Sequence, residues 1–384
     1  MRGGDHIGTD GAPHLLSWCD TTIGLPYETG IQRVTRRLAA ALERRGITVM
    51  PVGWDARHRV MRALTTGAVA ASIDEAPTGS SDRWLLVPEI PMSALVQDLD
   101  PAQISRAYER RVAAIVHDLI PIRRAADYDA HTVGLHRRYF RMFADADLTI
   151  ATTDLVAGHL REYLRAEGLR EPEIAVVPLA AQFADLPRVR TRGPVRGPDE
   201  PLRLLAVSTW EPRKNYPLLL RAVRRAQAHS GRAIHLTIVG RRGCFPAYDA
   251  EVDVLLDGMG EVAVLDRAGD RELAELYRTH HASVYPSVEE GFGMPILESL
   301  WLGRPCLCHT GSSMAEVAPG GGTLMVDMAD EDAVAMGLIA LMSDAGLLDR
   351  LTGEALARPL RDWDAYAADV ARRLRLSAQI GGSA

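Results

Sequence analysis

The two glutamates Glu290 and Glu298 stand eight residues apart, on either side of a glycine-containing turn. We expect a strand to end before Glu290, and Pro295 suits the first position of the helix that follows the turn. Carboxylates that face a cleft accept hydrogen bonds from adjacent hydroxyl groups, which would suit a sugar and a ribose. Glycine lets a backbone approach a ligand closely, and free N–H groups at a helix start can hold a phosphate. The alternative is structural: Glu298 would stabilise the helix dipole, and Glu290 would be a solvated loop residue.

Lys214 is the only lysine in the chain, which has 44 lysine and arginine residues in total. A coding bias toward arginine accounts for the general scarcity of lysine. The ammonium group of lysine is a compact, strongly hydrated charge, whereas the guanidinium of arginine is a planar fork. Where a single charge must fit beside a phosphate, this compact shape would be a reason for the position to keep lysine. The alternative is a single leftover surface residue, and composition alone does not decide between the two.

Length and composition predict a soluble protein of two domains. A chain of 384 residues exceeds what one compact core usually holds, and its 47% hydrophobic content is ordinary for a globular protein. The formal net charge of −6 argues against a nucleic-acid partner. The chain shows no signal-peptide pattern and no uncharged apolar run of about 18 residues, so we expect a cytoplasmic protein.

The four cysteines form no Cys-x-x-Cys pair, so neither a zinc site nor a disulfide framework is expected. Cys306 and Cys308 stand two residues apart in an apolar segment. We expect them to point the same way from one strand as buried thiols.

Apolar runs alternate with helical patterns along the chain, an order that is typical of the α/β class with parallel sheets. In the first half we expect a helix at 31–45 and strands at 14–19, 47–52, 84–87, 112–116, 148–151 and 174–177. In the second half we expect helices at 217–229, 270–280 and 295–302, and strands at 203–207, 234–239, 262–265, 283–285 and 305–309.

These two halves predict two doubly wound domains that face one another across a cleft, with ligands beyond the carboxyl ends of the strands. The N-terminal domain is expected at 1–185 and the C-terminal domain at 201–360. Residues 186–200 are rich in proline and arginine and nearly free of apolar residues, so they are predicted to be the linker. The tail, 361–384, contains a helical pattern and is expected to pack back toward the N-terminal domain.

Five segments resemble, in order along the chain, those of the retaining glycosyltransferases of family four, which have the GT-B fold of two Rossmann-like domains. Each match alone is weak, but the ordered set is specific. The segments are Thr29-Gly30-Ile31-Gln32-Arg33-Val34, Val116-His117-Asp118-Leu119-Ile120-Pro121, Glu211-Pro212-Arg213-Lys214-Asn215, the E-x7-E motif from Glu290 to Glu298, and Ser312-Ser313-Met314-Ala315-Glu316-Val317.

This resemblance implies roles for the residues around the two glutamates. The C-terminal domain would bind the nucleotide sugar, and the N-terminal domain would bind the acceptor. Glu298 would bind the nucleotide ribose, and Glu290 would hold the donor sugar. The turn between them would contribute its backbone amides, from Gly291, Phe292, Gly293 and Met294.

The resemblance also implies roles for residues in the other segments. Lys214 would neutralise the donor diphosphate that becomes the leaving group. His117 would touch the donor sugar or the leaving phosphate from the opposite domain, and Gly30 would let the first loop approach the phosphates. Many family members carry an arginine five residues before the lysine, where this chain has Thr209. Arg213 either supplies the second charge or points away from the site.

The reaction implied by the resemblance moves a hexose from a nucleotide-diphosphate sugar to a glycan or lipid-linked glycan, with retention and without a metal cofactor or an obligatory protein nucleophile. Fixed cations and a helix start would stabilise the departing diphosphate. The segments at Gly30 and His117 resemble those of mannosyl- and rhamnosyltransferases of surface polysaccharide assembly, so a donor of the GDP-mannose type is expected. The alternatives are a non-catalytic protein that binds sugar nucleotides and a transferase for small-molecule acceptors.

Three further patterns have structural explanations. Asp145-Ala146-Asp147 has the form of a metal motif from a different glycosyltransferase fold, but such pairs arise often by chance. Gly320-Gly321-Gly322 leads into a strand without a helix start, so we expect a turn rather than a phosphate loop. A solvated face is expected for the arginines of the first helix, with peripheral contact to the inner face of a membrane as the alternative. These arginines are Arg33, Arg36, Arg37, Arg44 and Arg45.

Overall fold

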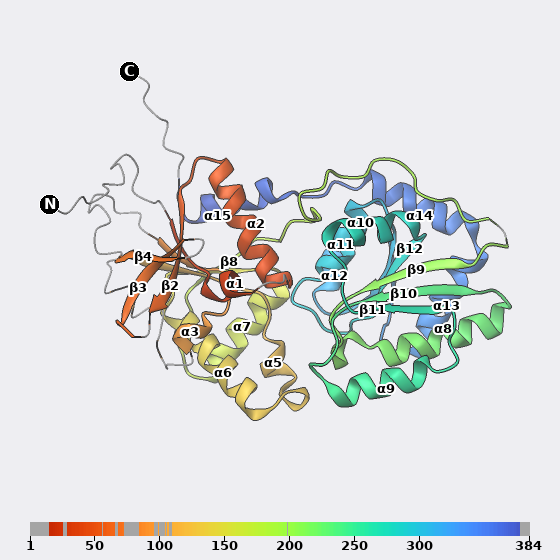
Figure 1. The fold of residues 1–384 in the computed structure, drawn as a ribbon, viewed down its shortest axis with the longest axis horizontal. Coiled ribbons are helices and arrows are strands. Elements are labelled where there is room, and N and C mark those ends of the chain that lie inside the picture. Colours follow the sequence, from red (N-terminus) through yellow and green to blue (C-terminus); the bar gives the residue numbers. More distant parts are fainter. Residues whose placement is uncertain are drawn as a thin grey trace, which may run out of the picture. The chain divides into compact units, whose positions relative to one another are not determined.

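The computed structural model describes residues 15–25, 29–55, 57–65, 68–72, 84–95, 99, 104, 106, 110–197 and 199–376. The chain forms two compact units, each with its own sheet covered by helices (Figure 1). The first unit comprises the residues up to Leu179 together with those from Trp363 onward, and the second comprises Ala180–Asp362. The predicted α/β class is confirmed. His14, which begins the first expected strand, lies outside the described residues.

The sheet of the first unit has the strand order β4-β3-β2-β1-β5-β6-β7-β8. Neighbouring strands are parallel from β2 through β8, whereas β3 and β4 add antiparallel pairs at one edge. The strands are β1 (Leu15–Trp18), β2 (Val49–Asp55), β3 (Val60–Thr65), β4 (Ala68–Ser72), β5 (Trp84–Val87), β6 (Arg111–Val116), β7 (Leu148–Ala151) and β8 (Glu173–Val176).

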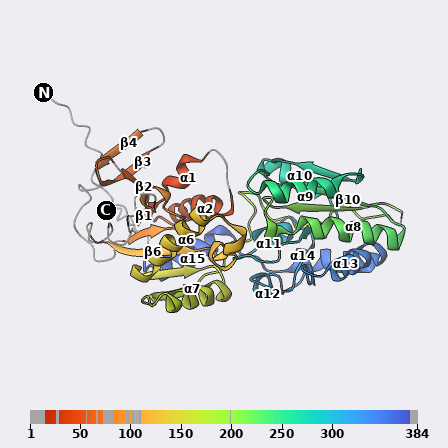
Figure 2. The same ribbon diagram turned by 90° about the horizontal axis from the view of Figure 1, so that it is seen from below.

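Helices cover both faces of this sheet, with α2 and α15 on one face and α3, α6 and α7 on the other (Figures 1 and 2). Helix α2 begins at a capping box between Thr29 and Gln32, and its apolar face is buried at Val34, Leu38 and Leu42. The helices of the unit are α1 (Asp20–Gly24), α2 (Gly30–Arg44), α3 (Met92–Leu95), α5 (Ile120–Arg123), α6 (Ala130–Arg141), α7 (Asp154–Ala166) and α15 (Trp363–Arg373).

Helix α15 belongs to the first unit, where it packs beside α2. Its buried face carries Trp363, Tyr366 and Val370. Just beyond the helix, the carbonyl oxygen of Leu374 accepts a 2.8 Å hydrogen bond from the indole Nε1 of Trp84. Residues 363–374 are therefore anchored by buried apolar side chains and by a hydrogen bond to β5.

The sheet of the second unit is parallel throughout, in the order β11-β10-β9-β12-β13-β14. Its strands are β9 (Leu202–Val207), β10 (Ile234–Val239), β11 (Val262–Leu265), β12 (Ala282–Tyr285), β13 (Cys306–His309) and β14 (Thr323–Val326). Cys306 and Cys308 are free and buried in one core cluster beside α11, as predicted.

Figure 1 shows α8 and α9 on one face of this sheet and α10 and α11 on the other. The helices are α8 (Tyr216–Ser230), α9 (Pro246–Leu256), α10 (Asp270–Thr279), α11 (Met294–Trp301), α12 (Met314–Val317), α13 (Glu331–Ser343) and α14 (Ala345–Ala357). The three glycines 320–322 all have positive φ and lead into β14, which is the turn that the sequence predicted.

Each sheet has a point where the direction of winding reverses. In the first unit it lies between β1 and β5, and in the second between β9 and β12. Ligands of doubly wound sheets bind beyond the carboxyl ends of the strands at this switch point. We therefore expect a ligand site in the loops after β1, β5, β9 and β12.

The described residues of the predicted linker, 186–197 and 199–200, lie within the second unit. The backbone N–H of Val189 donates to the carbonyl of Trp301 at 3.0 Å, and the Trp301 indole donates to the carbonyl of Leu186 at 3.0 Å. The guanidinium of Arg188 donates to carbonyls at the end of α14. Proline and glycine exclude helix and strand here, but arginine side chains and backbone groups still fix the segment. We refer to residues 186–194 as the strap.

Candidate functional site

Lys214 lies buried at the switch point of the second sheet. Strand β9 ends at Val207, and the loop after it closes with a short 3-10 helix, Pro212–Lys214. Asn215, in the left-handed conformation with φ 54°, joins this turn to α8. The Lys214 ammonium lies 2.5 Å from Oε1 of Glu290 and 2.9 Å from the hydroxyl of Tyr285, and the residue is only 6% exposed. It is therefore not a leftover surface lysine.

Glu290 is the acceptor on which this cluster converges. Its Oε1 atom also receives hydrogen bonds from the hydroxyls of Tyr285, at 2.7 Å, and Ser287, at 2.5 Å, and pairs with Nη1 of Arg213 at 2.6 Å. Burial by itself raises the pKa of this carboxyl, but the charges of Arg213 and Lys214 outweigh it and lower the pKa to about 2. Glu290, whose side chain is 10% exposed, is thus a largely enclosed, ionised acid rather than a solvated loop residue.

The two cations of the cluster are held differently. Burial lowers the pKa of Lys214, and the charge of Arg213 lowers it further, while Glu290 opposes both effects. Arg213 bridges two acids, with Nε 2.8 Å from Glu211 and Nη1 on Glu290, and it also donates to the Glu289 carbonyl. Arg213 therefore points into the cluster rather than away from it.

Backbone contacts join the two loops that carry the cluster. The N–H of Val288 donates to the carbonyl of Arg213 at 2.9 Å. The hydroxyl of Ser312, in the loop after β13, accepts from the N–H of Glu290 at 3.0 Å and donates to its carbonyl at 3.1 Å. Sequence reasoning did not assign roles to Tyr285, Ser287 or Ser312. Two features of the sequence could have pointed to them. Tyr285 and Ser287 lie at or just after the end of an expected strand, and Ser312 lies in a matched segment.

The turn between the two glutamates leads directly into α11. Gly293 precedes the helix with φ 91°, and a Cβ there would lie 3.3 Å from the side chain of Ile296 and 3.3 Å from that of Met314. Gly291 and Phe292 are buried beside it.

Glu298 lies inside α11, in its second turn, and is only 4% exposed. The side chain is thus enclosed, unlike a residue that acts only on the helix dipole from a solvated face. The structure brings Lys214, Arg213 and Glu290 into direct contact, and it places Glu298 on the helix that follows.

His117 and Gly30 belong to the first unit. His117 follows β6, and its Nε2–H donates to the carbonyl of Pro88 at 2.8 Å, which leaves Nδ1 as the acceptor nitrogen. Burial lowers the pKa of His117, so the imidazole is neutral at pH 7. Gly30 is the exposed first residue of α2.

An acid that the sequence analysis did not single out lies at the switch point of the first sheet. Glu89 follows β5, is fully buried, and accepts hydrogen bonds from the N–H of Thr22, at 3.0 and 3.1 Å, and from its hydroxyl. Burial raises the pKa of Glu89 to about 7, with a further contribution from the charge of Asp20, against the hydrogen bonds from Thr22. The signal was its position, two residues after an expected strand.

The Asp-x-Asp pair has structural partners. Asp147 accepts the N–H of Val112 at 2.7 Å, and Asp145 pairs with Arg106 at 3.0 Å. Within the described ranges, no group of three or more His, Cys, Asp or Glu residues is arranged to hold a metal ion.

The arginines of α2 include two with defined partners. Arg36 donates to the carbonyls of Thr22, at 2.8 Å, and Leu25, at 3.2 Å, and Arg44 pairs with Asp364 of α15 at 2.8 Å. These contacts fix part of the basic face within the first unit. Among the helices that the structure describes, none has the length and apolar character needed to cross a membrane.

Comparison with known sequences connects this chain to sugar-transferring enzymes. Residues 201–344 match the family model of group 1 glycosyl transferases. The O-antigen chain mannosyltransferase B of Escherichia coli is 32% identical over 160 residues, which are 40% of this chain and 40% of that protein. The serotype-specific mannosyltransferase WbdA of Escherichia coli is 25% identical over 325 residues, 76% of this chain and 38% of that protein. The chain thus matches less than half the length of these relatives.

Comparison with solved structures identifies the fold. Sucrose-phosphate synthase from Thermosynechococcus elongatus is 17% identical with a TM-score of 0.66, over 94% of this chain and 98% of that one. HepE from Anabaena, solved in complex with UDP and glucose, is 14% identical with a TM-score of 0.64, over 94% of this chain and 99% of that one. These likenesses confirm the GT-B fold, with a Rossmann-like sheet in each unit that is parallel apart from the antiparallel edge strands β3 and β4.

Proposed function

We propose that this chain, which belongs to the group 1 glycosyltransferases, transfers a hexose from a nucleotide-diphosphate sugar to a glycan or lipid-linked glycan, with retention. The observation that carries the proposal is the convergence of Lys214 and Arg213 on Glu290 at the switch point between β9 and β12. The mannosyltransferase relatives support a donor of the GDP-mannose type.

The cluster suits a donor whose diphosphate carries negative charge. Lys214 and Arg213 already lie side by side on one carboxylate, so they are positioned before the ligand arrives and need little reorganisation. A bound diphosphate would share these cations with Glu290. Glu290 would then be free to accept hydrogen bonds from hydroxyls of the donor sugar, beside the backbone of Gly291, Phe292, Gly293 and Met294. Arg213 would supply the second charge that is missing at Thr209.

We assign the ribose of the nucleotide to Glu298 and a hydroxyl of the donor sugar to His117. The neutral His117 ring, with Nε2 bound to Pro88, offers a lone pair on Nδ1. A hydroxyl can donate to this lone pair, whereas a phosphate oxygen cannot. His117 therefore suits the sugar better than the leaving phosphate. Gly30, at the start of α2, would let its loop approach the phosphates.

In the proposed reaction, the bond between the anomeric carbon and the diphosphate oxygen breaks, and a bond from the acceptor oxygen to the same carbon forms. The departing diphosphate takes the electron pair of the broken bond and receives the proton of the acceptor hydroxyl. Lys214 and Arg213 stabilise the charge that develops on the departing oxygen. This sequence needs neither a protein nucleophile nor a metal ion as a reactant.

Two measurements test the proposal. The first is a thermal-shift panel with free UDP, GDP, ADP and dTDP, in which the cognate nucleotide raises the unfolding temperature because it binds only the native state. The second is release of nucleoside diphosphate from UDP-, GDP- and dTDP-sugars in the presence of an acceptor extract. We expect release with a GDP-sugar. Tight binding with no release from any donor would instead indicate a non-catalytic sugar-nucleotide-binding protein.

Lys214→Arg tests whether the shape of the ammonium matters. Lys214 fits between Tyr285 and Glu290 in a closed site, and a planar guanidinium is too large to make both contacts without moving them. We expect turnover to fall by about 10²- to 10³-fold, the range for loss of one transition-state donor. Steady-state kinetics with the cognate donor would measure it. Arg225→Lys, at an exposed ion pair on α8, is the control and should keep full activity.

A further inference from the structure

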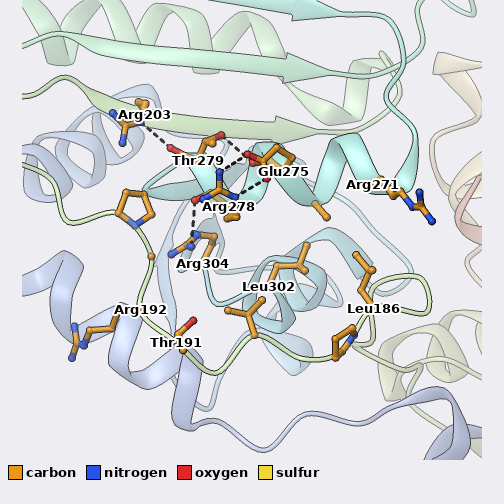
Figure 3. A pocket seen from close by; sticks show the side chains of 15 residues that line it. Leu186, Thr191, Arg192, Arg203, Arg271, Glu275, Arg278, Thr279, Leu302 and Arg304 are labelled. Carbon is orange, nitrogen blue, oxygen red and sulfur yellow. Dashed lines mark hydrogen bonds and ion pairs between the residues drawn. The ribbon is translucent and has the colours of Figure 1, made fainter.

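A cavity of about 800 Å³ between the strap and helix α10 does not bring its charged side chains together (Figure 3). Arg271 turns away at the opposite end of α10 from Arg278 and Arg304. Arg278 is paired with Glu275, and Arg304 donates to backbone carbonyls. Polar groups of the second unit converge instead on Glu290, in the loop after β12.

Ser312, in the loop after β13, has a backbone conformation that serine rarely adopts. Its φ is 57°, in the left-handed region, where the Cβ of an L-residue crowds the backbone. Five non-glycine residues of the described chain have a positive φ, and two of them, Asn215 and Ser312, lie in the loops that carry the Lys214–Glu290 cluster. Asparagine adopts this conformation more readily than most residues do. Glycine adopts it without strain, so a serine here points to a contribution from the hydroxyl.

The Ser312 hydroxyl bonds to both backbone polar groups of Glu290. It accepts from the N–H at 3.0 Å and donates to the carbonyl oxygen at 3.1 Å. The N–H belongs to the peptide plane before the Cα atom of Glu290, and the carbonyl belongs to the plane after it. One hydroxyl therefore restrains both planes, and with them the direction in which the Glu290 side chain leaves the backbone.

Glu290 needs such a restraint because of where it lies in the chain. Strand β12 ends at Tyr285 and α11 begins at Met294, so neither a strand ladder nor a helix fixes the backbone of Glu290. Its carboxylate is held by charge, through Lys214 and Arg213. In the proposed reaction a bound diphosphate shares these two cations, which weakens their hold on the carboxylate. The bonds from Ser312 go to the backbone and do not depend on those charges.

The loop that carries Ser312 is itself fixed to the core. The Ser312 carbonyl accepts a 3.1 Å hydrogen bond from the N–H of Ala315. The next two residues, Ser313 and Met314, are fully buried, and Met314 belongs to the same core cluster as Cys308. The hydroxyl is thus presented to Glu290 from a supported position.

We propose that Ser312 is a positioning residue for the transfer reaction. Its hydroxyl holds the backbone of Glu290, so that the carboxylate stays aimed at the donor sugar after the diphosphate has drawn Lys214 and Arg213 toward itself. This role rests on the proposed function, in which Glu290 accepts hydrogen bonds from hydroxyls of the donor sugar. Ser312 acts through Glu290 and does not itself touch the sugar.

Two substitutions remove the hydroxyl but differ in the backbone. Ser312→Ala keeps the Cβ and hence the strain, whereas Ser312→Gly adopts the left-handed conformation freely. We expect both to lower the rate of nucleoside-diphosphate release at saturating donor by about tenfold, with the donor that the wild type uses. Ser312→Gly should nevertheless unfold at a higher temperature than Ser312→Ala, because only glycine relieves the strain. Turnover therefore follows the hydroxyl, while stability follows the backbone.

The free nucleoside diphosphate of that donor separates this role from a general disturbance of the site. It carries no sugar to reach Glu290, so both variants should bind it within about threefold of the wild type. Ser343→Ala, at the exposed end of α13, is the matched serine control and should keep the turnover of the wild type.

Amide hydrogen exchange measures the same contact without catalysis. The N–H of Glu290 loses its acceptor in both variants and should exchange at least about tenfold faster than in the wild type. The N–H of Val288, which donates to the carbonyl of Arg213, should exchange at the rate of the wild type.

Full activity in either variant would overturn the proposal. In Ser312→Gly it would mean that only the left-handed turn matters, and in Ser312→Ala it would mean that glycine acts through its flexibility. Unchanged exchange at the N–H of Glu290 would overturn it as well. If the wild type releases no nucleoside diphosphate from any donor, the proposed function fails separately, and the exchange rates still decide whether Ser312 holds Glu290.

Discussion

At the scale of single residues, Glu290 and Glu89 show how position changes the chemistry of a carboxylate. Both lie in loops that follow a strand at the switch point of a sheet, where Glu89 is fully buried and the side chain of Glu290 is 10% exposed. Glu290 faces Lys214 and Arg213, which lower its pKa to about 2, while Glu89 accepts hydrogen bonds from the neutral donors of Thr22 and lies near the charge of Asp20, and its pKa rises to about 7. Burial acts in the same direction on both acids, so the neighbouring charges decide the outcome.

Glu290→Gln would preserve the shape of the side chain and remove its charge. We expect the free energy of unfolding of the second unit to fall by about 3 kcal/mol, because Lys214 and Arg213 lose a buried partner. Free nucleoside diphosphate should bind about tenfold more tightly, since its charge would no longer share the cations with Glu290. Transfer should be lost. Calorimetric unfolding would measure the loss of stability, and titration with nucleoside diphosphate would measure the gain in affinity.

Tyr285→Phe is the matched control for this substitution, because it removes the hydroxyl that donates to Glu290 and accepts from Lys214 but leaves the charges in place. We expect it to change nucleotide affinity by less than about threefold. If Glu290→Gln weakened nucleotide binding instead, the cations would not be the groups that hold the diphosphate.

At the scale of elements, the sequence predicted those parts whose pattern comes from burial on a regular sheet. The strand at 84–87 is buried at every position, and the apolar spacing of 31–45 matches the buried face of α2. Strands β3 and β4 were not predicted, because they pair antiparallel at an edge and lack a regular alternation. The strap was predicted as a linker because its fixed contacts are backbone hydrogen bonds and arginine side chains, which leave no periodic apolar signal.

The candidate site was predictable at the level of motifs but not of contacts. Lys214, Glu290 and Arg213 stand out by type and spacing, yet their convergence on one oxygen atom depends on the parallel pairing of β9 with β12, whose residues are far apart in the sequence. Glu89 carries no motif, and its raised pKa arises from burial. The chemistry of that residue is set by the tertiary fold.

Helix α15 offers a test of how one element supports the first unit. Leu374 is fully buried just beyond the helix, and its carbonyl binds Trp84. We expect Leu374→Ala to lower the free energy of unfolding of the first unit by about 2 to 5 kcal/mol, from lost burial and the cavity left behind. Arg373→Ala, at the exposed neighbouring position, should change it by less than about 0.5 kcal/mol. Equal effects of the two substitutions in denaturant titrations would show that the tail is not packed as described.

At the scale of the whole molecule, each unit contains its own sheet and its own switch point, and a carboxylate with a shifted pKa follows a strand at each of them. The two acids titrate in different ranges. Glu290, with a lowered pKa, contributes stability that is present above its ordinary pKa of 4.5 and is lost as the pH falls toward 2. Between pH 4.5 and 7 it is ionised in the folded and the unfolded chain alike, so its contribution is constant. Glu89 is the acid that changes in this range.

Glu89→Gln isolates that change. Below pH 4.5 the Glu89 carboxyl is protonated whether the chain is folded or not, and it carries no ionisation penalty. As the pH rises from 4.5 to about 7, the unfolded chain releases the proton while the folded chain retains it, so the folded state loses up to about 3 kcal/mol. The variant escapes this loss, and its unfolding temperature relative to that of the wild type should rise across this range and stay constant above it.

Calorimetry at pH 5, 6, 7 and 8 would measure the difference, with Asp129→Asn as the control in the same unit. Asp129 caps α6 by accepting hydrogen bonds from Thr132, which lower its pKa below the ordinary 3.8. It is therefore ionised in both states throughout these measurements, and its variant should differ from the wild type by the same amount at every pH. A pH-independent difference for Glu89→Gln as well would mean that Glu89 is ionised in the folded chain at pH 5, and that the hydrogen bonds from Thr22 outweigh its burial.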